Sequence, residues 1–302
     1  MPNKIVDTFA EAFDGIYAKV LITADDLETL RRAAMDVASS PSGPIGTTEA
    51  GVEEWVSKDE TPDGRVGVMI QVWSGLEEGK PFGAILKKFE KEFSYRIRQN
   101  VLVKPFTAVF DAHTSPEGKI DAMDRIVHCG DGYEWEEYRY GRRMIIVPTM
   151  VPDFQMERFI GYGSGVTGDN FWYMCKRKET VMEAGRKALK AIDEVEGVIA
   201  PYGICAAGSK VETKFPWIGG TTNHPYCPSL RDKLGKESKV PYGTSFIPEI
   251  VIHGVSLDAV KNAMKAGIEA IMDMDDVIMI SAGNYSGKLG KYKIFLRQLL
   301  AS

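Results

Sequence analysis

The amino-acid sequence predicts an α+β fold of two ferredoxin-like lobes, each a mainly antiparallel sheet flanked by helices. Three observations favour this class. The chain has 302 residues, enough for two domains that each bury a core. Strand, helix and strand patterns follow one another in each half, as in the repeated β-α-β unit of ferredoxin-like folds. The alternation is too interrupted for a doubly wound sheet or an eight-fold barrel.

We expect an N-terminal lobe of residues 1–150 and a C-terminal lobe of residues 151–302, dividing near Met150. In the first lobe, the apolar run at residues 19–23 predicts a strand. Apolar residues then recur at helical spacing, and Asp25 with Glu28 forms a variant of the capping box, so a helix is expected to begin there. The same criteria predict a strand over 66–73, a helix over 82–95 and a strand over 101–109.

The second lobe repeats this pattern. Its predicted elements are a strand over 171–175, a helix over 180–193, strands over 197–201 and 249–253, a helix over 257–272 capped by Ser256, and a strand over 277–280. Residues 202–247 are rich in Gly, Pro, Ser, Thr and Asn, which predicts a long irregular connection. Such connections in compact domains are more often functional than idle.

Composition excludes several classes of protein. Hydrophobic residues make up 44% and charged residues 26% of the chain, which is typical of a globular protein. The net charge of -5 argues against nucleic acid as the main partner. No signal peptide and no membrane-spanning segment is evident, and the four cysteines lack CxxC spacing, so we expect a cytoplasmic protein with free thiols and no membrane partner.

Several partial motifs do not predict cofactor binding. Residues 163–168 satisfy GxGxxG, but a strand follows them where a dinucleotide fingerprint needs a helix. Residues 283–288 are one residue short of a P-loop and lack Ser or Thr after Lys288. His224 with Cys227, and His128 with Cys129, lack paired metal-ligand spacing, so we expect no metal site.

Two segments remain as candidates for chemistry. Glu249 follows Pro248 and precedes the apolar run Ile250-Val251-Ile252, so it enters the edge of the core, where desolvation can raise a carboxyl pKa. Residues 281–290 form a glycine-rich polar loop after the last predicted strand. Position alone leaves a solvent-facing Glu249 and a simple tight turn as the commoner alternatives.

Irregular sequence blocks along nearly the whole chain point to a family. They are Asp7 to Phe13, Glu60-Thr61-Pro62-Asp63-Gly64-Arg65, Gly130 to Tyr133, Gly208-Ser209-Lys210-Val211, Thr222-Asn223 with Tyr226-Cys227-Pro228, Ser281-Ala282-Gly283-Asn284 and Gly287-Lys288-Leu289-Gly290. Together they resemble formylmethanofuran:tetrahydromethanopterin formyltransferase.

The resemblance implies reversible formyl transfer from formylmethanofuran to N5 of tetrahydromethanopterin in one-carbon metabolism, through a tetrahedral intermediate and without a metal or prosthetic group. It also implies a homotetramer, a dimer of dimers. The catalytic glutamate of the family corresponds to Glu249. We expect the loop residues to contact the two carrier substrates, and the candidates are Ser209, Lys210, Asn223, Ser281, Gly283, Asn284 and Lys288. Lys210, Lys214 and Lys288 are candidate partners for the glutamyl carboxylates of methanofuran.

Two alternatives stay open. The chain could be the formyltransferase subunit of a bacterial formyltransferase/hydrolase complex, which would share the chemistry but work with other subunits. It could also be a non-catalytic small-molecule sensor, because a fold alone does not set a function.

Overall fold

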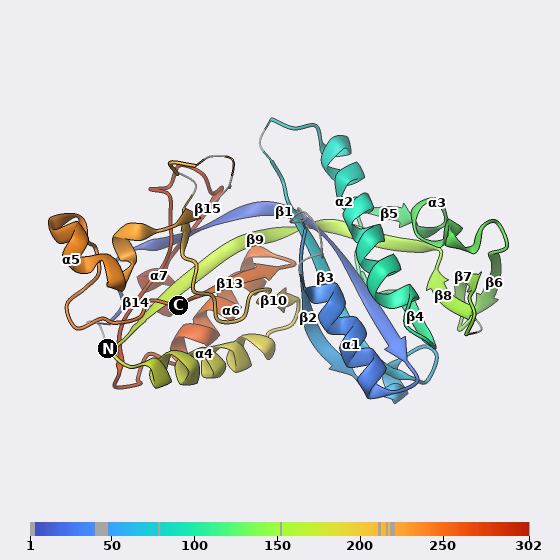
Figure 1. Cartoon of the computed structure of the whole chain (residues 1–302), viewed down its shortest axis with the longest axis horizontal. Coiled ribbons are helices and arrows are strands. Elements are labelled where there is room, and N and C mark those ends of the chain that lie inside the picture. The colour runs from blue at the N-terminus through green and yellow to red at the C-terminus, as the bar shows by residue number, and fades with distance from the viewer. Residues whose placement is uncertain are drawn as a thin grey trace. The chain divides into compact units, whose positions relative to one another are not determined.

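The computed structural model of the chain describes residues 4–39, 48–77, 79–151, 153–210, 213–215, 217 and 221–301, except the side chains of Arg125 and Ser209. The chain forms two compact units. The N-terminal unit is Asp14–Gly165, and the C-terminal unit combines Met1–Phe13 with Val166–Ser302. Two long strands, β1 (Phe9–Ala24) and β9 (Phe159–Cys175), contribute residues to both units (Figure 1).

The N-terminal unit contains a complete ferredoxin-like β-α-β-β-α-β set. Its elements are β1, α1 (Leu27–Ala38), β2 (Glu49–Val56), β3 (Val66–Gly75), α2 (Phe82–Ile97) and β4 (Thr107–Asp111). The strands pair antiparallel in the order β2-β3-β1-β4. Beyond β4, which pairs parallel with β8, the unit adds α3 (Ala122–Arg125), β5 (Gly118–Asp121), β6 (Trp135–Arg139), β7 (Arg142–Pro148) and β8 (Asp153–Glu157).

Hydrophobic periodicity explains how these elements pack. In β1, residues Ile16, Ala18, Val20 and Ile22 alternate with residues of the other face and enter the core. The apolar stripes of α1 and α2 cover them, as the 3.6-residue period predicts, through residues such as Leu30 and Phe89.

The N-terminal end of α1 is one residue later than predicted. Asp26 is the N-cap, and its side chain accepts a hydrogen bond of 2.9 Å from the N–H of Thr29. The neighbouring Asp25 instead forms an ion pair of 3.1 Å with Arg65. Either aspartate suits a cap by type, so only the tertiary contact with Arg65 separates them.

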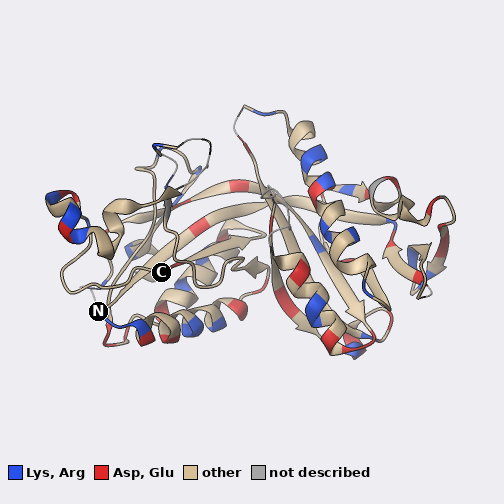
Figure 2. Cartoon of the chain, in the orientation of Figure 1, with Lys and Arg blue, Asp and Glu red and all other residues tan. Residues whose placement is uncertain are grey.

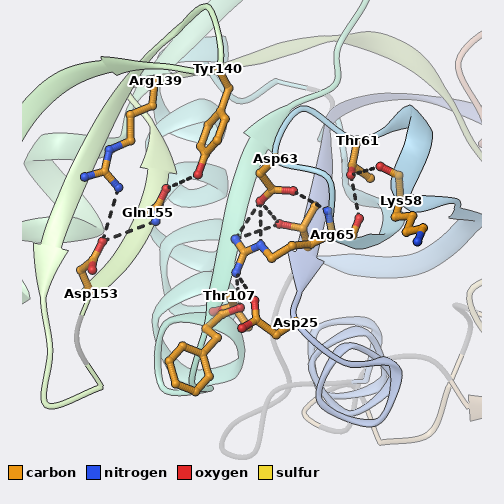
Figure 3. A network of polar contacts seen from close by, with 12 residues as sticks. Asp25, Lys58, Thr61, Asp63, Arg65, Thr107, Arg139, Tyr140, Asp153 and Gln155 are labelled. Carbon is orange, nitrogen blue, oxygen red and sulfur yellow. Dashed lines mark hydrogen bonds and ion pairs between the residues drawn. The ribbon is translucent and has the colours of Figure 1, made fainter.

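Arg65 fastens the turn before β3 to the end of β1 (Figure 3). Besides Asp25, its guanidinium contacts Asp63 at 2.7 Å and the hydroxyl of Thr23 at 3.2 Å. The Glu60 to Arg65 block of the sequence therefore has a structural role through the contacts of Arg65.

A second polar cluster in the same unit joins Arg139 to Asp153 at 3.8 Å.

The C-terminal unit repeats the ferredoxin-like set with β9, α4 (Lys178–Asp193), β10 (Val198–Ile199), β13 (Glu249–Gly254), α6 (Leu257–Glu269) and β14 (Val277–Ser281). The strand order β10-β13-β9-β14 is again antiparallel. Ser256 caps α6 as predicted, accepting a hydrogen bond of 3.1 Å from the N–H of Ala259. The unit ends with β15 (Tyr292–Phe295), paired with Phe9–Ala12 of β1, and α7 (Leu296–Ala301).

Strand alternation determines the face of this sheet on which Glu249 lies. Ile250 and Ile252 of β13, with Phe171 and Tyr173 of β9, belong to the core that α4 and α6 complete. Because successive side chains point to opposite faces, Glu249 lies on the face turned away from those helices.

The described residues between β10 and β13 are largely irregular, as expected. They include the short pair β11 (Ser209–Lys210) and β12 (Thr221–Thr222), α5 (Arg231–Leu234) and short 3-10 turns at His224–Tyr226, Pro228–Leu230 and Gly235–Glu237.

The α+β class with mainly antiparallel sheets flanked by helices is confirmed, and some element boundaries differ. The strand expected over 101–109 begins only at Thr107, because Arg98–Leu102 continues α2 as a π-helical turn. Neither compact unit is confined to one half of the chain, because β1 and β9 each contribute to both. Phe9–Ala12 pair with β15, and Phe159–Tyr162 of β9 pair with β5 of the N-terminal unit.

Charged residues of both signs are interleaved along α1 and α4 (Figure 2). Such mixing is typical of a solvated helix face. Within the described ranges, no helix is both long and apolar enough to cross a membrane.

Candidate active site

Glu249 is a buried carboxyl held by two N–H donors. It opens β13 and has an exposed fraction of only 6%. The indole Nε1 of Trp172 donates a hydrogen bond of 3.2 Å to its Oε2, and the backbone N–H of Gly208 donates one of 3.1 Å to its Oε1. A carboxylate has about four lone-pair sites, so each oxygen keeps room for another partner. Glu249 is therefore buried rather than solvent-facing, and it can still accept a ligand or a proton.

The register of the sheet fixes this geometry. Glu249 lies directly opposite Trp172 of β9 in the β13–β9 pair. On the other side, its backbone exchanges two hydrogen bonds of 2.9 Å with Cys205, which leads the chain towards Gly208. Burial raises the pKa of the Cys205 thiol, and the charge of Glu249 raises it further. Because only a thiolate is a strong nucleophile, this arrangement does not activate Cys205 for nucleophilic attack.

An open cavity of about 160 Å³ adjoins the carboxyl. It shares Trp172 and Gly208 with the Glu249 site, and Tyr226 meets Trp172 edge-on with ring centroids 4.8 Å apart. Its lining is Trp172, Ala206, Ala207, Gly208, Thr222, Asn223, Tyr226, Cys227, Pro228, Ser229 and Ile247. This space is below the roughly 300–1,000 Å³ of a typical ligand pocket, so it suits one flat ring rather than a whole carrier molecule.

A second cavity of about 550 Å³ shares Thr222 with the first. Among the residues that the structure describes, its lining contains Lys210, Lys214 and Lys233 and one carboxylate, Glu237. The other lining residues are Thr213, Phe215, Thr221, His224, Leu230 and Leu234. Excess positive charge beside an aromatic cavity favours a ligand with a ring head and an anionic tail.

The glycine-rich loop after β14 begins at the same indole as Glu249. Ser281, the last residue of β14, lies opposite Trp172, as Glu249 does on the other flank of β9. The N–H of Gly283 donates a hydrogen bond of 2.7 Å to Oδ1 of Asn170. A Cβ at Gly283 would lie 3.0 Å from the Trp172 ring, so a side chain there would crowd the indole. The carboxyl and the loop therefore meet at Trp172.

The structure brings together some of the predicted contact residues and not others. Asn223 lines the smaller cavity and Lys210 the larger one. Ser209 pairs with Thr222 through β11 and β12. The side-chain amide of Asn284 is turned onto β1, where it donates to Thr8 and to the carbonyl of Phe9. Lys288 has an exposed side chain and does not line either cavity.

The sequence-based prediction missed Trp172, Gly208 and Tyr226. Trp172 was placed in a strand, but nothing local to the sequence sets that strand opposite Glu249. In the part of the chain that the structure describes, no group of three or more His, Cys, Asp or Glu side chains could hold a metal ion.

Two ferredoxin-like units with a buried, donor-held carboxyl beside a ring-sized cavity suit an enzyme that acts on a ring-bearing small molecule. Residues 2–149 match the model of a family described as formylmethanofuran-tetrahydromethanopterin formyltransferase, and residues 152–299 match that of its proximal lobe. The chain belongs to the formylmethanofuran-tetrahydromethanopterin formyltransferase family.

Solved structures share the fold over nearly the whole chain. The formylmethanofuran:tetrahydromethanopterin formyltransferase of Methanosarcina barkeri is 37% identical with a TM-score of 0.87, each chain being covered to 98%. A chain of the formyltransferase/hydrolase complex of Methylorubrum extorquens, solved with methylofuran, is 30% identical with a TM-score of 0.86, covering 98% of this chain and 96% of that one.

Curated relatives form two groups by name. A formyltransferase-like protein of Methanothermobacter marburgensis is 55% identical, with 98% of each chain covered. Archaeoglobus fulgidus has a formyltransferase-like protein that is 46% identical over 97% of this chain and 95% of its own. It also has a formylmethanofuran--tetrahydromethanopterin formyltransferase that is 39% identical over 98% of each chain. The chain is thus more similar to the formyltransferase-like protein of that organism than to its formyltransferase.

Proposed function

We propose that the protein transfers a formyl group between formylmethanofuran and N5 of tetrahydromethanopterin, with Glu249 moving the proton. The observation that carries the proposal is the placement of Glu249 between the Trp172 and Gly208 N–H donors, beside the 160 Å³ cavity. Family membership suggests the substrates, the resemblance to the family suggests Glu249, and the buried position of Glu249 beside the cavity supports that choice.

The reaction requires one net proton movement. N5 of the pterin attacks the formamide carbon, a C–N bond forms, and the carbonyl electrons move to oxygen to give a tetrahedral intermediate. As this collapses, the C–N bond to the furfuryl amine breaks. N5 has lost a proton and the departing amine gains one. A carboxylate with free lone pairs can accept the first proton and deliver the second, a contribution of about 10²–10⁴-fold to the rate.

The two cavities suit the two parts of a carrier molecule. In this proposal a ring head enters beside Trp172 and Tyr226, near Asn223. Anionic groups of the carrier meet Lys210 and Lys214 in the larger cavity. Ser209 contacts substrate from β11, and Ser281, Gly283, Asn284 and Lys288 contact it from the glycine-rich loop.

The direct test is product formation. The purified protein is incubated with formylmethanofuran and tetrahydromethanopterin, and N5-formyl product is followed by absorbance and mass spectrometry. Product that forms in proportion to enzyme supports the proposal. Absence of product, under conditions in which an authentic formyltransferase gives it, contradicts the proposal.

A second candidate follows from the greater similarity to formyltransferase-like proteins. Archaeoglobus fulgidus contains both a formyltransferase and a formyltransferase-like relative, so the two groups coexist in one organism. A member of the second group could bind the carriers as a sensor, without transferring formyl. Calorimetry together with the transfer assay separates the two candidates. A sensor binds tetrahydromethanopterin but forms no N5-formyl product, whereas a formyltransferase does both.

We also propose a homotetramer, a dimer of dimers, located in the cytoplasm. The alternative is a subunit of a larger complex, as in the Methylorubrum extorquens structure. Light scattering on active, purified protein distinguishes them. A mass of four chains supports the homotetramer, and activity that depends on added subunits supports the complex.

A further inference from the structure

Glu11 of β1 is a second buried carboxyl, and it is surrounded by backbone N–H groups. Its exposed fraction is 1%. Oε1 accepts hydrogen bonds from the N–H of Tyr285 at 2.8 Å and from the N–H of Gly287. Oε2 accepts from the N–H of Leu289 at 3.1 Å and from the N–H of Gly290 at 2.6 Å. Four amides of one short loop therefore converge on one side chain.

The glycines make this convergence sterically feasible. Ser286 and Gly287 have positive φ angles of 59° and 72°, and this turn brings the N–H groups of Tyr285 and Gly287 to the same carboxylate oxygen of Glu11. A Cβ on Gly290 would lie 2.6 Å from the Cβ of Glu11, so only glycine can approach so closely.

The arrangement holds a charged carboxylate. Burial acts to raise the pKa of Glu11, but the four backbone hydrogen bonds outweigh it and lower the pKa below its ordinary value. The segment that resembles a P-loop thus cradles an anion that belongs to the protein itself.

The same loop reaches the candidate active site. Its first part is fixed by the Asn284 amide on β1 and by the hydrogen bond from Gly283 to Asn170. Burial raises the pKa of Tyr285, and the negative charges of Glu249 and Glu11 raise it further, so both carboxyls act on this ring. The loop therefore begins against the indole of Trp172, where Ser281 pairs opposite it and Gly283 packs on its ring.

We infer that Glu11 is a positioning residue, an internal anion that holds residues 281–290 in the form that binds the carrier substrates. The inference rests on the proposed function for the identity of those substrates. Glu11 itself does not touch them. It acts through the loop, so its loss should weaken binding more than it slows the chemical step.

The test compares Glu11→Gln with a matched control. Glutamine replaces one oxygen by an NH₂ group that opposes two N–H donors. Glu11→Asp keeps both oxygens on a stem one methylene shorter and should recover part of the effect. The control is Glu134→Gln in the N-terminal unit, whose carboxyl has a side-chain exposure of 3% and accepts from the N–H of Gly132 at 3.0 Å.

Two measurements are made on each variant. Hydrogen–deuterium exchange of peptides covering 281–290 reports whether the loop is held. Calorimetric titration with tetrahydromethanopterin and with formylmethanofuran gives Kd for each carrier. In Glu11→Gln we expect faster loop exchange and an increase in Kd on the order of tenfold for at least one carrier. Glu134→Gln should change neither.

Three outcomes separate the claims. Unchanged loop exchange, or a Kd within twofold for both carriers, overturns the positioning role of Glu11. If Glu11→Gln binds the carriers more weakly than wild type, the positioning role of Glu11 is supported. If the wild-type protein binds the carriers but transfers no formyl group, the proposed activity is contradicted while the positioning role still stands. If Glu11→Gln does not fold, Glu11→Asp is judged by the same two criteria.

Discussion

The indole N–H of Trp172 donates a hydrogen bond of 3.2 Å to the carboxyl of Glu249, and the two residues lie directly opposite each other in the β9–β13 pair. Cross-strand placement makes the contact a consequence of sheet register. A slip of one residue would turn one of the two side chains to the opposite face of the sheet. The contact between Trp172 and Glu249 therefore depends on the pairing of these two strands.

Replacement of Trp172 by Phe tests this contact. The ring remains, but the donor to Glu249 is lost, and a hydrogen bond to a charged group contributes about 1.5–3 kcal/mol. We expect kcat/KM to fall by roughly 10- to 150-fold. The control is Trp73→Phe, which loses a hydrogen bond of 2.7 Å to Gln71 in the N-terminal unit. Equal losses of activity in the two variants would mean that losing any buried indole hydrogen bond lowers activity, and that the contact with Glu249 has no special role.

Asp169 should make stability depend on pH. It is fully buried, and neither carboxyl oxygen has a hydrogen-bond partner among the described residues. Burial raises its pKa well above the ordinary value, against a smaller opposite effect of the Asn170 backbone. Between the unfolded and folded pKa values the native state binds more protons, so stability falls as pH rises through that window.

Asp169→Asn should therefore be more stable than wild type at pH 8, with the gain shrinking towards pH 4. Urea unfolding at both pH values measures the difference. A gain of equal size at the two values would mean that ionisation of Asp169 is not its cause.

Cys227 offers a reporter of cavity occupancy. It lines the 160 Å³ cavity and is partly buried, whereas Cys129 is exposed and lies in the other unit. Saturating tetrahydromethanopterin and formylmethanofuran should slow iodoacetamide labelling of Cys227 several-fold and leave Cys129 unchanged. Mass spectrometry of the labelled peptides gives both rates. Equal rates with and without carriers at Cys227 would place binding elsewhere.

The sequence predicted the helices better than the strands, for physical reasons. The apolar residues of α1, α2, α4 and α6 recur at regular helical spacing, so each helix can be predicted from its own segment of the sequence. Strand β2 was missed because a bulge between Val52 and Glu54 breaks its alternation. The apolar residues from Val101 resemble a strand, but they continue α2, and Phe106 at φ 56° turns the chain before β4.

The site could be predicted only in part. Family resemblance identified Glu249, but its partner Trp172 is 77 residues away and is set by register. The contact between Glu11 and Gly290 spans 279 residues. No local pattern shows that a glycine-rich loop at one end of a chain encloses a carboxylate from the other end.

Glu249→Gln removes the group that moves the proton in the proposed reaction. Glutamine keeps the size of the side chain and can still accept one hydrogen bond, but it cannot carry a proton between the two nitrogens. Glu157→Gln in the N-terminal unit is the control, since its carboxyl also accepts a backbone N–H, at 2.9 Å from Asp111.

The decisive measurement is kcat for formyl transfer with both carriers saturating. For Glu249→Gln we predict a loss of about 10²–10⁴-fold with KM values close to wild type, in a protein that still folds but is less stable because the new NH₂ group faces the N–H donor of Trp172 or Gly208. A kcat within twofold of wild type would remove Glu249 from the mechanism.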